Sequence, residues 1–378
     1  MMHGTDMKKI VWQIAGLMAI MLLLAACSGE KNEFEPTPVH TRALTIDLST
    51  GTAVEGNKEP IRSVRFIVFD DISSAAPKLD VNRLEPVDGT EKTTFTANLL
   101  VTENADKLIV AIVNEPGTMK DKLDQINHPT ILQHLPFTLS DALNNGGNPV
   151  TTEHKGLPMI GTMGLSISGD ELSDLPSGAL KKGPIIVYRI LARVDVYLKN
   201  QTNSKPGSVV GSASTAELIH SSKKGYLVRT SYKNHSGEPV AFGRWMRTTD
   251  SEYVEETNLS WIASVGETVD NTLNNGAGLY LCSFYIPEWE YNATASDALG
   301  IRISGIKDYS GQNRDGVMYL TKRPDNTNPM TAIERNNVYK ITGIIPQSEL
   351  PEVPIIFGGI TVAPWGPVTD INIDNPIN

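Results

Sequence analysis

Histidines and cysteines are the side chains that most often bind zinc, and their spacing in this chain matches no zinc motif. Six histidines follow the first 27 residues: His40, His128, His134, His154, His220 and His235. None belongs to a His-Glu-x-x-His pattern, and Cys27 and Cys282 are too far apart in sequence for a Cys-x-x-Cys pair. We therefore predict no metal site and interpret the histidines as scattered surface residues.

Two short patterns look like catalytic or calcium-binding motifs but lack positions that those motifs require. Residues 164–169, Gly-Leu-Ser-Ile-Ser-Gly, resemble a nucleophile elbow, yet their glycines have the wrong spacing. Asp370, Asn372 and Asp374 match the first positions of a calcium loop, but Asn375 replaces the necessary glycine and no glutamate follows. There is no glycine-rich phosphate loop either. The sequence therefore predicts no catalytic residue and no cofactor.

Cys27 has the clearest chemistry of any residue in the chain. Lys8 and Lys9 precede a largely apolar run over residues 10–26, which ends in Leu-Ala-Ala directly before Cys27. This order is typical of a bacterial lipoprotein signal, in which the cysteine thiol is acylated and the preceding bond is cut. We predict that residues 1–26 are a signal peptide and that lipid on Cys27 holds the mature chain on the outer membrane. The alternative is a short transmembrane anchor with an incidental cysteine.

Size and charge limit what the rest of the chain can be. Removing 26 residues from 378 leaves 352, more than one hydrophobic core usually covers, so we expect two domains. The net charge is −10 and no basic block is present, which argues against a nucleic-acid partner. With Cys27 acylated, Cys282 has no cysteine left to pair with, so no internal disulfide is expected.

Alternation of apolar and polar residues with a period of two predicts an all-β fold. Leu44, Ile46 and Leu48 alternate with polar residues and predict a half-buried strand. The other predicted strands cover residues 64–69, 95–101, 108–113, 185–198, 226–229, 279–286, 299–306, 317–320 and 338–345. Many short strands separated by turn residues favour two β-sandwiches in series.

Composition divides the chain into four segments. After the signal peptide (1–26), residues 27–42 are polar and contain two prolines, so they are interpreted as a flexible lipidated tether. A polar, glycine-containing stretch at 201–214 places the domain boundary, giving sandwiches over 43–203 and 204–378. Residues 115–155 are expected to be mostly loop with a helical turn near 140–143, and 252–264 is the best helix candidate.

Seven segments, in this order behind the predicted lipidation motif, resemble the fimbrillins, the type V pilin family of Bacteroidetes. They are IRSVRFIVFD (61–70), LIVAIVNEP (108–116), LPMIG (157–161), YRILARVDV (188–196), FYIPE (284–288), RNNVYKITG (335–343) and VAPW (362–365). The resemblance implies two transthyretin-like β-sandwich domains and a role as a structural subunit of surface fimbriae that contributes to adhesion.

In that family, a trypsin-like protease cuts the lipoprotein precursor after an arginine and removes the first strand. The resemblance therefore implies a groove that accepts a strand from another fimbrial subunit, which is β-augmentation. Leu44, Ile46 and Leu48 would be the anchors of the removable strand.

The donor strand would come from the C-terminus of the chain. One candidate face carries Ile371, Ile373 and Ile377, and another carries Ile356, Gly358, Ile360 and Val362. The alternative is that both segments are ordinary edge strands of the second sandwich.

The position of the cleavage site departs from the family pattern. Arg42 precedes the Leu44 strand, so a cut there would free the lipid without opening the groove. Arg62 follows the strand but directly precedes the next one, and no arginine lies between residues 43 and 61. An uncleaved anchor subunit at the fimbrial base, or a tip subunit, therefore remains open.

Two further hypotheses belong to other functional classes. A surface lipoprotein adhesin would bind host glycan or protein, with Trp245, Trp261, Trp289 and Trp365 as candidate aromatic platforms. A carbohydrate-active enzyme would need two carboxylates about 5 to 10 Å apart across a cleft, an arrangement that leaves no sequence motif. We favour the non-enzymatic reading.

Overall fold

In a computed structural model, fourteen segments of the chain are described: residues 41–50, 60–70, 77–87, 92–102, 106–143, 156–165, 179–202, 207–233, 238–247, 259–260, 266–291, 298–320, 330–347 and 353–364. They belong to one compact unit, Thr41–Asn378. The predicted signal peptide, Cys27 and most of the tether lie outside the described residues. Within the described segments, no helix has the length and apolar character needed to cross a membrane.

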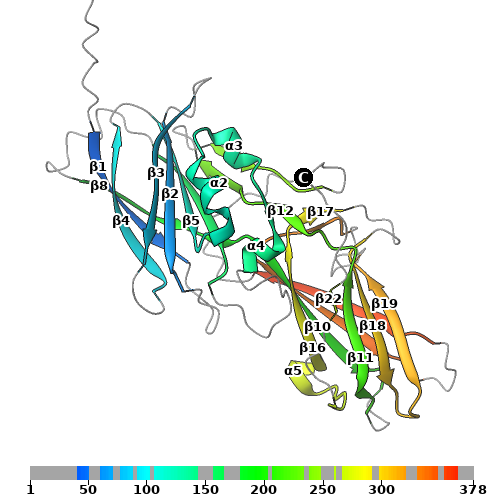
Figure 1. The fold of residues 1–378 in the computed structure, drawn as a ribbon. Coiled ribbons are helices and arrows are strands. Elements are labelled where there is room, and N and C mark those ends of the chain that lie inside the picture. Colours follow the sequence, from blue (N-terminus) through cyan, green and yellow to red (C-terminus); the bar gives the residue numbers. More distant parts are fainter. Residues whose placement is uncertain are drawn as a thin grey trace, which may run out of the picture. The chain divides into compact units, whose positions relative to one another are not determined.

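The first sandwich consists of a three-stranded and a five-stranded sheet (Figure 1). The smaller sheet has the order β4 (Thr94–Thr102), β1 (Thr41–Ser49), β8 (Ala179–Ile186). The larger has the order β3 (Lys78–Pro86), β2 (Ser63–Asp70), β5 (Lys107–Val113), β7 (Met159–Leu165), β9 (Tyr188–Arg189). Their facing side chains form one core, to which β1 contributes Leu44, Ile46 and Leu48.

Short helices cover the outer face of the five-stranded sheet. They are η1 (Gly117–Met119), α2 (Lys120–Asp124), α3 (Pro129–Gln133) and α4 (Leu139–Leu143), with a short strand β6 (Pro136–Thr138) among them. Because both faces of the sheet are covered, every residue of β5 is buried, and its sequence after Lys107 is continuously apolar instead of alternating. The helical turn near 140–143 is confirmed. The expectation of mostly loop was wrong for residues 117–143, since helices of five residues are too short to give a periodic pattern.

The second sandwich packs two four-stranded sheets. One has the order β16 (Leu279–Pro287), β10 (Leu191–Asn200), β21 (Asn337–Ile345), β22 (Ile356–Pro364). The other has the order β15 (Leu259–Ser260), β11 (Val209–Ile219), β18 (Gly300–Lys307), β19 (Asn313–Tyr319). Three two-stranded ribbons, β12 (Lys224–Tyr226) with β6, β13 (Arg229–Lys233) with β14 (Pro239–Gly243), and β17 (Trp289–Glu290) with β20 (Ala332–Ile333), and the short helix α5 (Leu273–Gly276) complete the described elements.

The predicted all-β sandwich fold is confirmed, with two local corrections. The predicted single strand over 185–198 is divided among β8, β9 and β10, which belong to three different sheets. Arg189, Ile190, Leu191 and Ala192 are buried in succession, so no single face continues through this stretch. In the predicted helix at 252–264, the two described residues, Leu259 and Ser260, form strand β15. The domain division stays a prediction; β10 precedes the expected boundary and pairs with strands that follow it.

Candidate functional site

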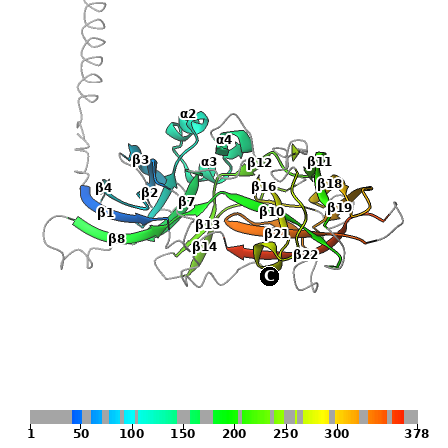
Figure 2. The same cartoon turned by 90° about the horizontal axis from the view of Figure 1, so that it is seen from below.

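Strand β1 lies in the middle of its sheet, between two strands that are distant in sequence. It pairs antiparallel with β4, with Thr41 opposite Thr102 and Ser49 opposite Thr94, and parallel with β8, with Ala43 opposite Ala179. Figure 2 shows β1 alongside both neighbours. If β1 were removed, β4 and β8 would therefore be left as the walls of a groove one strand wide.

The side chains that β1 directs inward are fully buried. Leu44, Ile46 and Leu48 have 1%, 0% and 1% of their surface exposed, and they join the core between the two sheets. Burial of such a side chain contributes about 1.5 to 3 kcal/mol. The apolar alternation thus identified the anchoring residues of this strand, although their predicted removal stays a prediction.

The outward face of β1 is half-buried and polar. Thr45 Oγ1 donates a hydrogen bond of 2.8 Å to Asn98 Oδ1, and Thr96 Oγ1 donates one of 2.8 Å to Asp47 Oδ1. Both are cross-strand pairs in the β1–β4 ladder. Since a one-residue slip would turn the buried leucines and isoleucine outward, burial and these pairs favour the same register.

The β8 side of the groove is less regular than the β4 side. Ile46 lies opposite Lys182 and Leu48 lies opposite Ile185. Between these pairs β8 advances by three residues and β1 by two, so β8 has one extra residue here. The irregularity contains Pro184, which has no backbone N–H to donate to β1. Antiparallel pairing with β4 is therefore the more continuous of the two attachments.

One candidate cleavage arginine lies within β1 and the other lies after it in the sequence. Arg42 is within β1, with its backbone opposite Val101, so a cut after it would leave all three apolar anchors in place. Arg62 is exposed and directly precedes β2. Its backbone N–H donates to Asn114 Oδ1 at 2.8 Å, and its carbonyl oxygen accepts from Val87 N at 2.9 Å. A cut after Arg62 would separate β1 from the rest of the chain.

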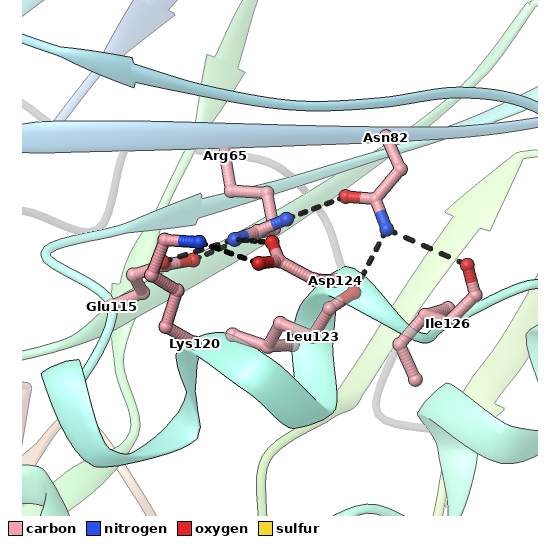
Figure 3. Close-up of polar contacts among 7 residues, drawn as sticks. All are labelled: Arg65, Asn82, Glu115, Lys120, Leu123, Asp124 and Ile126. Carbon is pink, nitrogen blue, oxygen red and sulfur yellow. Dashed lines mark hydrogen bonds and ion pairs between the residues drawn. The ribbon is translucent and has the colours of Figure 1, made fainter.

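A charged cluster centred on Arg65 lies under α2 in the first sandwich (Figure 3). Arg65, 1% exposed, donates to Glu115 Oε2 at 2.5 Å, to Asp124 Oδ1 at 2.7 Å and to Asn82 Oδ1 at 2.7 Å. Burial opposes the charge, but the hydrogen bonds that Arg65 donates to the Glu115 and Asp124 carboxylates raise its pKa. Asn82 Nδ2 also donates to Leu123 O at 2.8 Å. The cluster fastens α2 to the sheet.

Of the two candidate donor segments, only one lies within the described residues. Ile371, Ile373 and Ile377 lie outside the described residues. The other segment is β22, at one edge of its sheet and antiparallel to β21. Its register shifts between Gly359 and Phe357, so a bulge at Gly358 turns Ile356 away from the face of Ile360. Ile360 is 5% exposed and Ile356 is 43% exposed, so the predicted common face is not present.

The remaining predicted side chains give no second site. Trp289 is 1% exposed, and Trp245 is half-buried with the Arg229 guanidinium 3.4 Å from its ring centroid, which covers one face. Trp261 and Trp365 lie outside the described residues. Burial and the Asp195 carboxylate raise the pKa of the Cys282 thiol. Within the described segments, no three His, Cys, Asp or Glu side chains are grouped for metal binding.

Sequence reasoning missed half of the groove. Residues 95–101 were recognised as a strand, but β8 was not, apart from its last two residues. Leu-Lys-Lys-Gly-Pro at 180–184 has no alternation, and the parallel partner of β1 lies more than a hundred residues away in sequence. Local patterns carry no information about such a pairing.

Solved structures similar to this chain come from fimbrial and adhesion proteins. No family model and no curated protein matches the chain. The tip fimbrial protein Mfa3 of Porphyromonas gingivalis, solved with a C-terminal truncation, aligns over 86% of this chain and 100% of its own, with 12% identity and a TM-score of 0.53. The fimbrilin FimA of the same organism aligns over 85% and 98%, with 15% identity and a TM-score of 0.51. A Parabacteroides distasonis protein assigned to cell adhesion aligns over 86% of this chain and 97% of its own, with 15% identity and a TM-score of 0.53.

At identities of 12 to 15%, these alignments establish the fold. The resemblance to the fimbrillins read from the sequence is therefore confirmed as a shared architecture that spans most of the chain. All three structures are described as fimbrial or cell adhesion proteins. What those proteins do bears on this chain only as a proposal.

Proposed function

We propose that this chain is a structural subunit of surface fimbriae and joins its neighbours by strand exchange in the groove between β4 and β8. The observation that carries the proposal is the position of β1, which is central in its sheet and is buried on one face only. The shared architecture with fimbrial proteins supports a role as a fimbrial subunit, independently of how the subunits join.

The energetics of the groove support exchange instead of simple loss of β1. Without β1, the pockets of Leu44, Ile46 and Leu48 and one backbone edge on each of β4 and β8 would face water. Such an edge pairs readily with another strand. A strand with apolar residues at every second position would restore both the buried area and the main-chain bonds, each worth about 1 kcal/mol.

The route to the surface is part of the same proposal. The chain would be exported as a lipoprotein acylated on Cys27, reach the outer membrane, and be cut by a trypsin-like protease after Arg62 or left uncut. Residues 371–377 of another copy, or a strand of a different subunit, would then fill the groove. We propose no enzymatic activity, no cofactor and no nucleic-acid partner.

An engineered cut tests strand exchange directly. Residues 53–58 would be replaced by the recognition sequence of a site-specific protease, which separates β1 from β2 without using a native arginine. After the cut, a labelled peptide of residues 41–50 should replace β1 with one peptide per chain, and the same peptide carrying Ile46→Asp should not bind. If the wild-type peptide never enters, even when the cut chain is incubated in mild denaturant, strand exchange in this groove is wrong.

One observation favours the uncleaved anchor as a second candidate. No arginine lies between residues 43 and 61, and the backbone around Arg62 is hydrogen-bonded: Ile61 N donates to Lys92 O, Arg62 N donates to Asn114 Oδ1, and Ser63 O accepts from Asn114 N. A protease needs an extended, accessible segment, which this arrangement restricts. Intact mass and N-terminal sequencing of the chain from sheared filaments and from the outer-membrane fraction separate the two. Lipidated chain starting at Cys27 in the membrane fraction alone identifies an anchor subunit or a surface lipoprotein outside the filament.

A further inference from the structure

Strand β4 has two backbone edges, and only one of them faces β1. In an antiparallel strand, the backbone N–H and C=O groups of successive residues point to opposite sides. Thr93 O, directly before β4, accepts from Thr50 N at 3.1 Å, so odd-numbered residues face β1. Even-numbered residues of β4, such as Asn98, Leu100 and Thr102, therefore present their backbone groups at the outer edge of the sheet.

Side chains of β3, a strand of the other sheet, occupy two of these outer backbone groups. Arg83 Nη2 donates to Asn98 O at 2.7 Å. Thr102 N donates to Asp80 Oδ2 at 2.9 Å. Leu100 lies between them and is 62% exposed, the most exposed large apolar side chain in the described part of the protein. An apolar residue on an open strand edge is a site for unwanted strand pairing.

Asp80 lies at a bulge in strand β3. It is the extra residue of a bulge in the β2–β3 ladder, where Val68 pairs with Val81 and Phe69 with Leu79. The bulge frees Asp80 from the ladder and redirects its carboxylate.

Lys107 fixes that carboxylate. Its side chain is 0% exposed, and its ammonium donates to Asp80 Oδ2 at 3.0 Å, Asp70 Oδ1 at 2.9 Å and Thr102 Oγ1 at 2.6 Å. All three N–H donors of the lysine are thereby used. The contacts join the two sheets at the end of β4, where β1 begins.

We infer that Arg83 and Asp80 are specificity-determining residues that block the outer edge of β4 and so direct strand addition into the β4–β8 groove. A strand that paired with the outer edge would have to displace both side chains from Asn98 O and Thr102 N. Lys107 acts as a positioning residue through Asp80. The inference rests on the proposed function for its purpose, but the blocked edge itself can be tested while β1 is in place.

The first test uses the intact chain and a matched pair of variants. Arg83→Ala removes the donor to Asn98 O, and Arg302→Ala is the control. The two arginines are alike: Arg83 pairs with Glu85 at side-chain exposures of 47% and 23%, and Arg302 pairs with Glu217 at 46% and 22%. Sedimentation velocity should show concentration-dependent species of at least twice the monomer mass for Arg83→Ala. The wild type and Arg302→Ala should not show them. Equal behaviour of both variants overturns the inference.

A second test uses the chain cut between β1 and β2. The labelled peptide of residues 41–50 should bind once per wild-type chain and more than once per Arg83→Ala chain, because the outer edge becomes a second site. If one peptide binds to both chains, the blocking role is wrong while strand exchange stands. If no peptide binds to the wild type but Arg83→Ala self-associates when intact, the proposed function fails and the blocked edge stands.

Discussion

Strands β1 and β10 occupy the same kind of position in the two sandwiches, but they are held differently. Each is central in its sheet, antiparallel to one neighbour and parallel to the other, with β4 and β8 beside β1, and β16 and β21 beside β10. Along β1, buried and half-buried residues alternate; along β10, Val194, Asp195, Val196, Tyr197 and Leu198 are all buried.

The difference shows what makes a central strand separable. Both faces of β10 are covered, and β22 extends its sheet beyond β21, whereas the described strands of the first sheet end at β8. Removing β10 would expose buried side chains on both of its faces, but removing β1 would expose them on one face only. The same ladder pattern can therefore serve as permanent core in one sandwich and as an exchangeable element in the other.

The largest effect should come from truncating a core residue in each ladder. Ile46→Ala in β1 and Ile341→Ala in β21, both 0% exposed, should each lower the free energy of unfolding by about 2 to 5 kcal/mol in a denaturant titration. Ile46→Ala alone should also weaken retention of β1 in the cut chain, by about 30-fold or more. If Ile341→Ala releases β1 equally, the two sandwiches are not separable.

Two aspartate substitutions should show that the outward face of β10 contributes more to stability than the outward face of β1. Asp195 in β10 is 2% exposed, accepts from Ser283 Oγ at 2.6 Å and pairs with Arg193. Asp195→Ala should cost about 3 kcal/mol because it removes a buried carboxylate that accepts a hydrogen bond from Ser283 and pairs with the largely buried Arg193 guanidinium. Asp47→Ala in β1 should cost less than about 1 kcal/mol, since the lost bond is half-exposed. Thermal unfolding of both variants checks this; equal losses would remove the contrast.

Acid should act more strongly on the second sandwich. Burial of Asp308 opposes its charge, but hydrogen bonds from Ser310, Arg314 and Gln312 lower the pKa of this carboxyl below its ordinary 3.8. A carboxyl pKa that is lower in the folded state stabilises that state at pH values above the pKa of the unfolded chain, which is about 4. This stabilisation is lost as the pH falls from there through the pKa of the folded state. Asp308→Asn should therefore flatten the dependence of the unfolding free energy on pH between 5 and 2.

Asp124 provides the comparison in the first sandwich. Hydrogen bonds from Lys120 and Arg65 lower its pKa, but its side chain is 41% exposed and the charge is screened by water and salt. Asp124→Asn should flatten the same curve less than Asp308→Asn does. A larger effect for Asp124→Asn would mean that the cluster under α2 is the more acid-sensitive element.

The smallest effect should come from the outward face of β1. Thr45→Val keeps the shape of the side chain but removes its hydrogen bond to Asn98, so retention of β1 in the cut chain should fall only about two- to fivefold. The release rate of labelled β1 measures this. A loss as large as that of Ile46→Ala would place register control on the polar pairs instead of the apolar anchors.

The structure of an element could be predicted from the sequence where one of its faces is exposed to solvent. Leu44, Ile46 and Leu48 were identifiable because half-exposed residues separate them. Residues 64–69 and 108–113 were recognised as strands, but covered faces on both sides hid which residues meet which layer. The roles of Arg83, Asp80 and Lys107 arise where strands from two sheets meet, so no local pattern indicates them.

The ladder directions around β1 also have a mechanical meaning. A strand seated between β4 and β8 and pulled along its own axis loads the hydrogen bonds of both ladders in shear, so they resist together instead of opening one after another. Under the proposed function, tension along a fimbria would act in this direction at every joint. The central position that makes the strand replaceable during assembly would then make it resistant to force once assembly is complete.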